Sequence, residues 1–396
     1  MVVTKHLKYA PWLAIEPLVA LFTIYQKAGY EIRPVGGCIR DALLNNPIND
    51  WDLTTNAPPE VSLDICKNAG LHVIPTGLKH GTITAIFNHI PFEITTLRID
   101  TQSHGRHADV IWTGDWAQDA MRRDFTINSL YGDQKGDIYD YTGGLADLEH
   151  NIVRFVGNPH ERVTEDYLRI LRFFRFMARF GNFDKIDKPS LDACINNQEG
   201  LKQISAERIR AELLKILIAP QRTKAVCLMN EHSIFKTLGL SIENSDLSPL
   251  DKTEKKFSFE TSALRTLAYI LPRQADWAKT ARSLKLSNKE KAHLLNIQKG
   301  INTPVTLTPK ILRYFCYVLG LKVCQDIYIL KYSDDAYQVD DWYKLLPSPF
   351  PLSGKDLLKL GIKADENMGA LLKELEQDYI ESDFTLTKAQ LINKII

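Results

Sequence analysis

The sequence has few cysteines and no long hydrophobic run, and each absence excludes a class of protein. Its six cysteines among 396 residues form no CxxC pair and no Cys/His metal-site spacing, which predicts isolated thiols in a reducing compartment. No eighteen consecutive residues are apolar, and the first twenty lack a signal-peptide or transit-peptide pattern. We therefore expect a cytoplasmic protein with no membrane partner.

An excess of charge of one sign is also missing. The 49 Lys and Arg residues nearly balance the 48 Asp and Glu residues, giving a net charge of +1. Any binding of nucleic acid must therefore depend on a local basic face and not on the charge of the whole chain. The chain has no internal repeat and no low-complexity tract. Its hydrophobic content of 44% is that of a globular protein.

The hydrophobic patterns predict a mixed α/β segment followed by helices. Strand-like patterns occur at 32–35, 51–55, 72–75, 82–88 and 91–98, and helix-like patterns at 38–44 and 58–70. Beyond about residue 154 the strand patterns nearly vanish and amphipathic helical stripes recur. We therefore predict an α+β fold, divided into two to four domains.

Residues 35–55 are the most informative stretch of the chain. Gly36 and Gly37 lead into a predicted helix, and such a turn lets backbone N–H groups approach a phosphate closely. Asp50 and Asp52 stand two residues apart on a predicted strand, so both can reach one metal site. Either feature alone is usually an ordinary turn or a solvated loop. Their combination predicts nucleotidyl transfer with Mg²⁺.

This stretch resembles the signature of class II tRNA nucleotidyltransferases, in the pattern GGxxRD followed by DxD. That family comprises the CCA-adding enzymes and the related bacterial poly(A) polymerases, within the polymerase-β-like superfamily. The resemblance implies that Asp50 and Asp52 are the catalytic pair and hold two Mg²⁺. It also implies that Gly37 and Arg40 bind the nucleotide.

The resemblance implies a particular arrangement of domains. We expect a polymerase-β-like nucleotidyltransferase head at residues 1–150, consisting of a small mixed sheet with helices. A helical neck that selects the nucleotide follows at 151–220, and an all-α body and tail that bind tRNA at 221–396.

Two further segments bear on the branch of the family. Residues 76–84 resemble the CCA-adding branch, because they lack the basic run that bacterial poly(A) polymerases tend to carry there; taken alone they read as a hairpin turn. Residues 101–114 resemble a flexible loop that helps the family switch from C to A addition, which favours addition of the full CCA. Before this loop, Glu93 is a candidate third carboxylate, although a solvated glutamate at a strand edge explains it equally well.

Residues 119–128 resemble the family's contacts with the nucleotide ribose and triphosphate. The resemblance assigns these contacts to Arg122, Arg123, Asp124 and Asn128. Guanidinium groups suit a triphosphate because they donate paired, charge-assisted hydrogen bonds. The alternative is that Asp124 caps a helix and the arginines form a solvated face.

Residues 165–176 resemble the nucleotide-selecting helix of the family. We expect Asp166 and Arg169, at i and i+3, to share one side of this helix. Cytosine and adenine both present an amine beside a ring-nitrogen acceptor, which a carboxylate and a guanidinium can pair. Uracil and guanine would leave both groups mispaired, at about 1–3 kcal/mol each. Arg172 and Arg175 continue the helix and are expected to hold the triphosphate or to position the base-selecting pair.

The function implied is template-independent addition of CCA to the 3′ end of tRNA, with CTP and ATP as substrates and pyrophosphate released. A basic face for the acceptor and T-arm is predicted on the body, although a solvated helix surface is the better explanation for most of its candidates: Lys279, Arg282, Lys285, Lys289 and Lys291. The open alternatives are a poly(A) polymerase, an enzyme that adds only CC or only A, and an inactive tRNA-binding paralogue. Intact Asp50 and Asp52 argue against the last. The sequence contains no His-Asp dipeptide, so we see no sign of the phosphohydrolase domain that is fused to some bacterial relatives.

Overall fold

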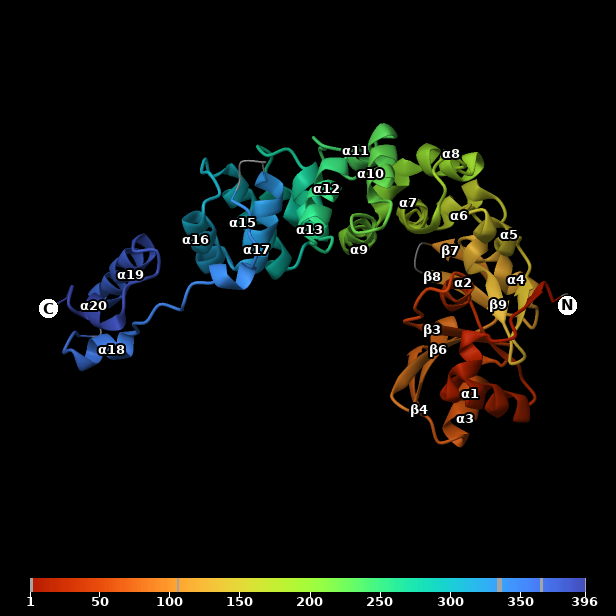
Figure 1. Cartoon of the computed structure of the whole chain (residues 1–396). Coiled ribbons are helices and arrows are strands. Elements are labelled where there is room, and N and C mark those ends of the chain that lie inside the picture. Colours follow the sequence, from red (N-terminus) through yellow and green to blue (C-terminus); the bar gives the residue numbers. More distant parts are fainter. Residues whose placement is uncertain (1–2, 105–106, 333–336, 364–365, 396) are drawn as a thin grey trace. The chain divides into compact units, whose positions relative to one another are not determined.

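The computed structural model describes residues 3–104, 107–332, 337–363 and 366–395 (Figure 1). The chain forms two compact units, Met1–Gly239 and Leu240–Ile396. The functional division predicted at residues 150 and 220 stays a prediction. Within the described ranges, no helix combines the length and the apolar character needed to cross a membrane.

The first unit contains a five-stranded sheet with strand order β2-β3-β6-β5-β4. Its strands lie where the hydrophobic patterns predicted them: β2 Ile32–Pro34, β3 Trp51–Thr55, β4 His72–Gly77, β5 Thr82–Phe87 and β6 Ile90–Thr96. β3 and β6 run parallel and the other neighbours antiparallel. In β6, Phe92 and Ile94 are buried and Glu93 is exposed, because successive side chains point to opposite faces.

Five helices accompany this sheet and the segment that follows it: α1 Glu16–Lys27, α2 Gly37–Leu43, α3 Pro59–Asn68, α4 Trp116–Met121 and α5 Gly144–Glu149. α1 buries Leu18, Leu21, Phe22 and Tyr25, whose spacing places them on one face of the helix. These positions confirm the predicted α+β character of this part of the chain.

Two smaller sheets were not predicted. β1 Lys5–His6, β10 Asp137–Asp140 and β9 Leu130–Gly132 form one. β7 Arg98–His104 and β8 His107–Trp112 form an antiparallel hairpin. The prediction of a loop at 101–114 is therefore largely wrong, because most of these residues form the strands of this hairpin. The segment is polar and lacks hydrophobic alternation, so its sequence does not indicate that its backbone pairs. Residues 105–106 of that loop lie outside the described part of the chain.

Helices make up the rest of the first unit: α6 Pro159–Glu165, α7 Leu168–Phe180, α8 Lys188–Asn196, α9 Ala206–Ile216, α10 Arg222–Glu231 and α11 Ile234–Thr237. α7 packs against α9 and α10. The centroid of the Phe125 ring lies 4.8 Å from the ring centroid of Phe155 and 4.9 Å from that of Phe176 on α7. This aromatic packing fixes α7 against the segment that carries the predicted triphosphate contacts.

The described part of the second unit consists of helices and connecting segments: α12 Ser248–Lys256, α13 Ala263–Ile270, α14 Trp277–Ser283, α15 Asn288–Asn302, α16 Pro309–Leu319, α17 Leu321–Lys331, α18 Gly354–Lys359, α19 Glu366–Glu381 and α20 Lys388–Ile392. A buried ion network joins four of them. Arg265 of α13 donates at 2.7 Å both to Glu254 of α12 and to Asp326 of α17, and Asp326 also lies 2.6 Å from His293 of α15.

Candidate active site

The glycine turn lies between β2 and α2, and the local geometry requires its small residues. Gly36 has a φ of 73°, and a Cβ there would lie 3.2 Å from the carbonyl oxygen of Asn128. The backbone N–H of Gly36 donates to the carbonyl of Leu130 at 2.9 Å, and that of Val35 to the carbonyl of Asp52. Only glycine combines this φ with this close approach at low cost. The turn is thereby fixed beside the strand that carries Asp52.

Three carboxylates gather at one end of β3. Asp52 pairs in register with Glu93 on the parallel strand β6, and Asp50 lies just before β3 begins. Partial desolvation and then the charges of Glu93 and Asp50 raise the pKa of Asp52, while Arg123 opposes the shift. Both negative charges favour the protonated form of Asp52, and a cation bound beside it would favour the ionised form.

Asp119 of α4 holds both members of the tandem arginine pair. Its carboxylate is fully buried and lies 2.7 Å from a guanidinium nitrogen of Arg122 and 3.0 Å from one of Arg123. The Tyr131 hydroxyl donates to the same carboxylate at 2.8 Å. Burial alone raises the pKa of Asp119, but the charges of Arg123 and Arg122 outweigh it and lower the pKa to about 2. Asp119 thus stays ionised and fixes both arginines.

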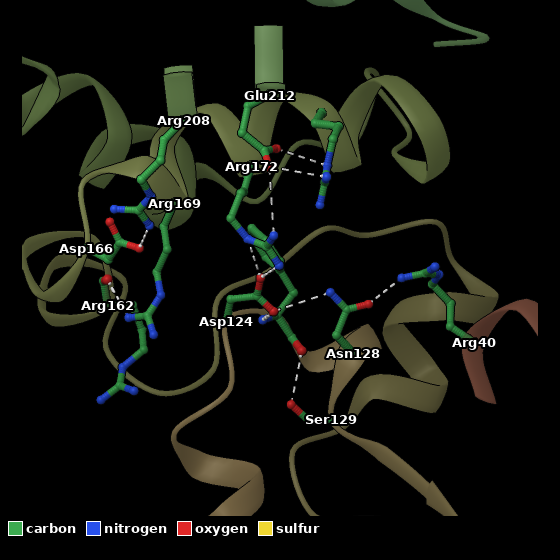
Figure 2. A network of polar contacts seen from close by, with 12 residues as sticks. Arg40, Asp124, Asn128, Ser129, Arg162, Asp166, Arg169, Arg172, Arg208 and Glu212 are labelled. Carbon is green, nitrogen blue, oxygen red and sulfur yellow. Dashed lines mark hydrogen bonds and ion pairs between the residues drawn. The ribbon is translucent and has the colours of Figure 1, made fainter. Parts of the chain in front are cut away.

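Asp124 and Asn128 connect α7 to α2. Asp124 accepts a hydrogen bond from Arg172 Nε at 2.8 Å, and Asn128 Oδ1 accepts one from Arg40 at 2.5 Å (Figure 2). Burial raises the pKa of Asp124, but the Arg172 charge prevails and lowers it to about 2. Asp124 does not cap a helix: it precedes the short 3₁₀ turn Thr126–Asn128.

The expectation that Asp166 and Arg169 share one side of a helix is wrong. α6 ends at Glu165, Asp166 has an extended conformation, and α7 begins only at Leu168. Asp166 breaks the helix because its side chain accepts a hydrogen bond from the Leu168 backbone N–H at 3.2 Å, which competes with continued helix. The two residues nevertheless line the same cavity.

Each of these two side chains is held by a different partner. Asp166 accepts a hydrogen bond from Arg208 of α9 at 2.6 Å (Figure 2). Arg169 donates to Glu165 at 2.5 Å. Arg169 also donates to the carbonyl of Arg162 at 2.6 Å. The contact from Arg208 thus connects α9 to the segment that carries Asp166.

A cavity of about 430 Å³ brings most of these groups together. Ten of the twelve predicted site residues line it: Gly37, Arg40, Asp52, Arg122, Arg123, Asp124, Asn128, Asp166, Arg169 and Arg172. Asp50 and Arg175 do not line it. Arg175 instead lies 3.2 Å from the buried carboxylate of Glu212 on α9, which also lies 4.0 Å from Arg172.

Several residues of the site were missed by sequence reasoning. Arg98 and Phe176 line the cavity without having been assigned to it, and Asp119, Arg208 and Glu212 contact residues that do. The spacing of Asp119, three and four residues before the tandem arginines, was a usable signal. The partners Arg208 and Glu212 carry no such signal, because they lie 37 to 42 residues from the groups they contact.

Comparison with known proteins places this site in a family. Residues 32–154 match the family model for the poly A polymerase head domain, and residues 185–243 match that for a probable RNA- and SrmB-binding site of polymerase A. The human mitochondrial CCA tRNA nucleotidyltransferase 1 is 35% identical, over 97% of this chain and 90% of that protein. A CCA-adding enzyme of Lactobacillus johnsonii is 32% identical, over 92% and 93% of the two chains. This chain belongs to the class II CCA-adding enzyme family.

Solved structures of CCA-adding enzymes share the fold. The Bacillus stearothermophilus enzyme, solved in complex with CTP, superimposes with a TM-score of 0.72 at 24% identity, over 96% of this chain and 97% of that one. The Thermotoga maritima enzyme, solved with tRNA, gives a TM-score of 0.65 at 18% identity, over 99% and 98% of the two chains. The predicted α+β fold, a small mixed sheet with helices followed by a helical remainder, is thereby confirmed.

The CCA-adding family also bears on two other predictions. Its nucleotidyltransferase chemistry implies use of a divalent metal in general. The human relative has a mitochondrial designation in its name. The comparisons therefore give no support to the predicted cytoplasmic location, which stays a prediction.

Proposed function

We propose that this protein adds CCA to the 3′ end of tRNA, using CTP and ATP and no nucleic-acid template. The observation that carries the proposal is the single cavity in which Asp52, five arginines of the predicted set and the Asp166–Arg169 segment converge. Its relatives are named for this activity, and solved neighbours are complexes with CTP, ATP and tRNA.

The pair Asp50 and Asp52 fits Mg²⁺, which is usually held by one or two carboxylates together with substrate phosphates. The described residues contain no group of three or more His, Cys, Asp or Glu side chains that could hold a metal alone. We infer that Asp50 and Asp52 are the protein ligands, that Glu93 adds negative charge, and that nucleotide phosphate completes the set. When bound, the metal makes the RNA 3′-hydroxyl more acidic and stabilises charge on the departing pyrophosphate.

The cavity's arginines hold the triphosphate in position for the transfer. Arg122 and Arg123 are fixed by Asp119, and Arg40 by Asn128, so little side-chain entropy is lost when phosphate binds. The RNA 3′ oxygen forms a bond to the α-phosphorus and gives up its proton. The bond from the α-phosphorus to the β-bridging oxygen breaks, and its electron pair leaves with pyrophosphate.

Asp166 and Arg169 select the base in this proposal. The Asp166 carboxylate accepts from the exocyclic amine of cytosine or adenine, and Arg169 donates to the adjacent ring nitrogen. Arg208 and Glu165 hold these two side chains apart, so that they face the base and do not neutralise each other. Uridine and guanosine present the reverse pattern of donors and acceptors and are rejected.

The assay that tests the function uses a tRNA transcript lacking its 3′ CCA. The protein is incubated with Mg²⁺ and CTP alone, ATP alone, or both, and the product lengths are read on a sequencing gel. The proposal expects two residues added with CTP alone and three with both. A long adenosine tail would instead indicate a poly(A) polymerase, and a halt after CC with both nucleotides present a partial enzyme. An Asp52→Ala variant that binds tRNA but adds nothing excludes a contaminating activity.

A further inference from the structure

A second cavity lies beside the 430 Å³ cavity, which we call the nucleotide cavity. It has a volume of about 410 Å³. We call it the side cavity and define it by six of its lining residues: Arg40, Arg175, Phe176, Arg179, Lys215 and Ile218. Arg40 and Phe176 line both cavities, so the two adjoin.

The side cavity has an excess of positive charge. Arg40 lies 2.9 Å from Asp41, and Arg175 lies 3.2 Å from Glu212. The nearest carboxylate to Arg179 is the same Asp41, at 3.9 Å. Four cationic groups therefore have two carboxylates in contact with them, Asp41 and Glu212, and the charge of Asp124 also acts on Arg40 and Arg175. Lys215 has no ion-pair or hydrogen-bond partner within the described part of the chain.

The crowding of these cations affects their ionisation. Burial lowers the pKa of Arg40, and the charge of Arg179 adds to that effect although Asp41 opposes it. Burial likewise lowers the pKa of Arg175, and Arg172 and Arg40 contribute, against Glu212. Cations that repel one another in this way are stabilised by a multivalent anion.

The position of the side cavity indicates which anion. Arg40 and Asp166 lie at opposite ends of the polar network in the nucleotide cavity (Figure 2). The side cavity therefore begins at the end remote from the base-selecting residues. In-line displacement also requires the RNA 3′-hydroxyl to attack from the side opposite the leaving group. A cationic space behind the triphosphate end is thus reached by pyrophosphate and not by the RNA primer.

We propose that the side cavity binds the pyrophosphate product as it leaves the nucleotide cavity, with Arg179 and Lys215 as its product-binding residues. Arg40, shared by both cavities, passes the anion from one to the other. Half of the Arg179 side chain is exposed, and Lys215 is exposed, so the anion can leave to solvent from there. This inference rests on the proposed nucleotidyl transfer.

The test measures pyrophosphate binding in the full-length protein with Arg179→Gln, Lys215→Gln and both changes. None of the three removes a residue of the nucleotide cavity. Isothermal titration with pyrophosphate in the presence of Mg²⁺ gives Kd without turnover, and product inhibition of CTP incorporation gives Ki. We expect both constants to rise about tenfold in the double variant, the loss expected for two exposed charge-assisted contacts. KM for CTP and for tRNA should change less than twofold.

Matched variants separate charge from structure. Lys215→Arg retains the charge and should retain the wild-type Kd for pyrophosphate. Lys236→Gln removes an exposed lysine of the same unit, on α11, outside the side cavity, and should have no effect. An unchanged Kd for pyrophosphate in the double variant would overturn the proposal. A selective rise in KM for tRNA would also overturn it, because it would assign Arg179 and Lys215 to RNA phosphates. The two proposals can fail separately. If the wild-type protein adds no nucleotide, the proposed function is refuted, whereas titration still measures pyrophosphate binding because it does not require turnover.

Discussion

At the scale of single residues, the site consists of pairs of side chains. In each pair, one side chain has a proposed role in binding substrate, and the other fixes its position. Asp119 fixes Arg122 and Arg123, and Arg208 fixes Asp166. Such partners matter because a long charged side chain otherwise loses considerable rotamer entropy when it binds a ligand. Their effects on stability and on substrate selection can be measured separately.

Replacing Asp119 by Asn should lower stability in a pH-dependent way. The folded-state pKa of about 2 is depressed below the ordinary value, so the ionised carboxylate contributes about 2 kcal/mol at neutral pH. This contribution is complete above about pH 4 and is lost as the pH falls toward 2. Urea unfolding at pH 7, 4 and 3 should therefore show a difference from wild type that shrinks with acid. An equal difference at every pH would contradict the assignment; exposed Asp64→Asn is the control.

Replacing Arg208 by Gln should weaken base selection more than catalysis. Without the 2.6 Å contact, the Asp166 carboxylate is free to turn toward Arg169 and away from the base. We expect the preference in kcat/KM for CTP over UTP to fall about tenfold, a loss of about 1.4 kcal/mol. Arg210→Gln removes another arginine of the same helix and should keep the wild-type preference. If both variants keep it, Arg208 does not position Asp166.

The residue types of the site could be predicted from sequence, but their partners only partly. The glycine turn, the Asp50–Asp52 pair and the tandem arginines each carry a local spacing that reflects their chemistry. Arg208 and Glu212 could not be found in this way, because their contacts depend on how α9 packs against α7. Asp166 was predicted to lie on a helix from its i, i+3 spacing with Arg169. That spacing does not show that the Asp166 side chain accepts a hydrogen bond from the Leu168 backbone, at the break between α6 and α7.

At the scale of elements, short hydrophobic strands were easier to predict than polar ones. β3, β5 and β6 have buried alternating residues and lie where they were expected. β1 has two residues, and its partner β10 follows more than 130 positions later, so no local pattern marks it. The β7–β8 hairpin was missed because its pairing comes from backbone hydrogen bonds in a polar segment.

The helices of the second unit depend on a buried ion network that can be tested. Asp326 is fully buried and accepts from Arg265, itself fully buried, at 2.7 Å. Replacing Asp326 by Ala leaves the Arg265 charge without one of its partners, and should destabilise this unit by about 3–5 kcal/mol. Hydrogen exchange should locate the loss in α13, α15 and α17. Uniform exchange across both units, or no change, would contradict a local role.

At the scale of the whole molecule, a chain of net charge +1 has to bind RNA through local basic faces. Lys279, Arg282 and Lys289 are exposed. If they contact phosphates, replacing all three by Gln should weaken tRNA binding and flatten the dependence of log K on log salt by about 0.7–0.9 per lost contact. Filter binding at several salt concentrations measures both. An unchanged slope would assign these residues to solvated surface.

The central claim is that this protein alone selects C, C and then A without a nucleic-acid template. The most direct measurement offers the wild-type protein a tRNA lacking CCA together with equal concentrations of all four nucleotide triphosphates and Mg²⁺, and sequences the added 3′ ends. The account predicts that nearly every extended molecule ends in CCA and is no longer than that. Ends rich in U or G, or adenosine tails of many residues, would contradict it.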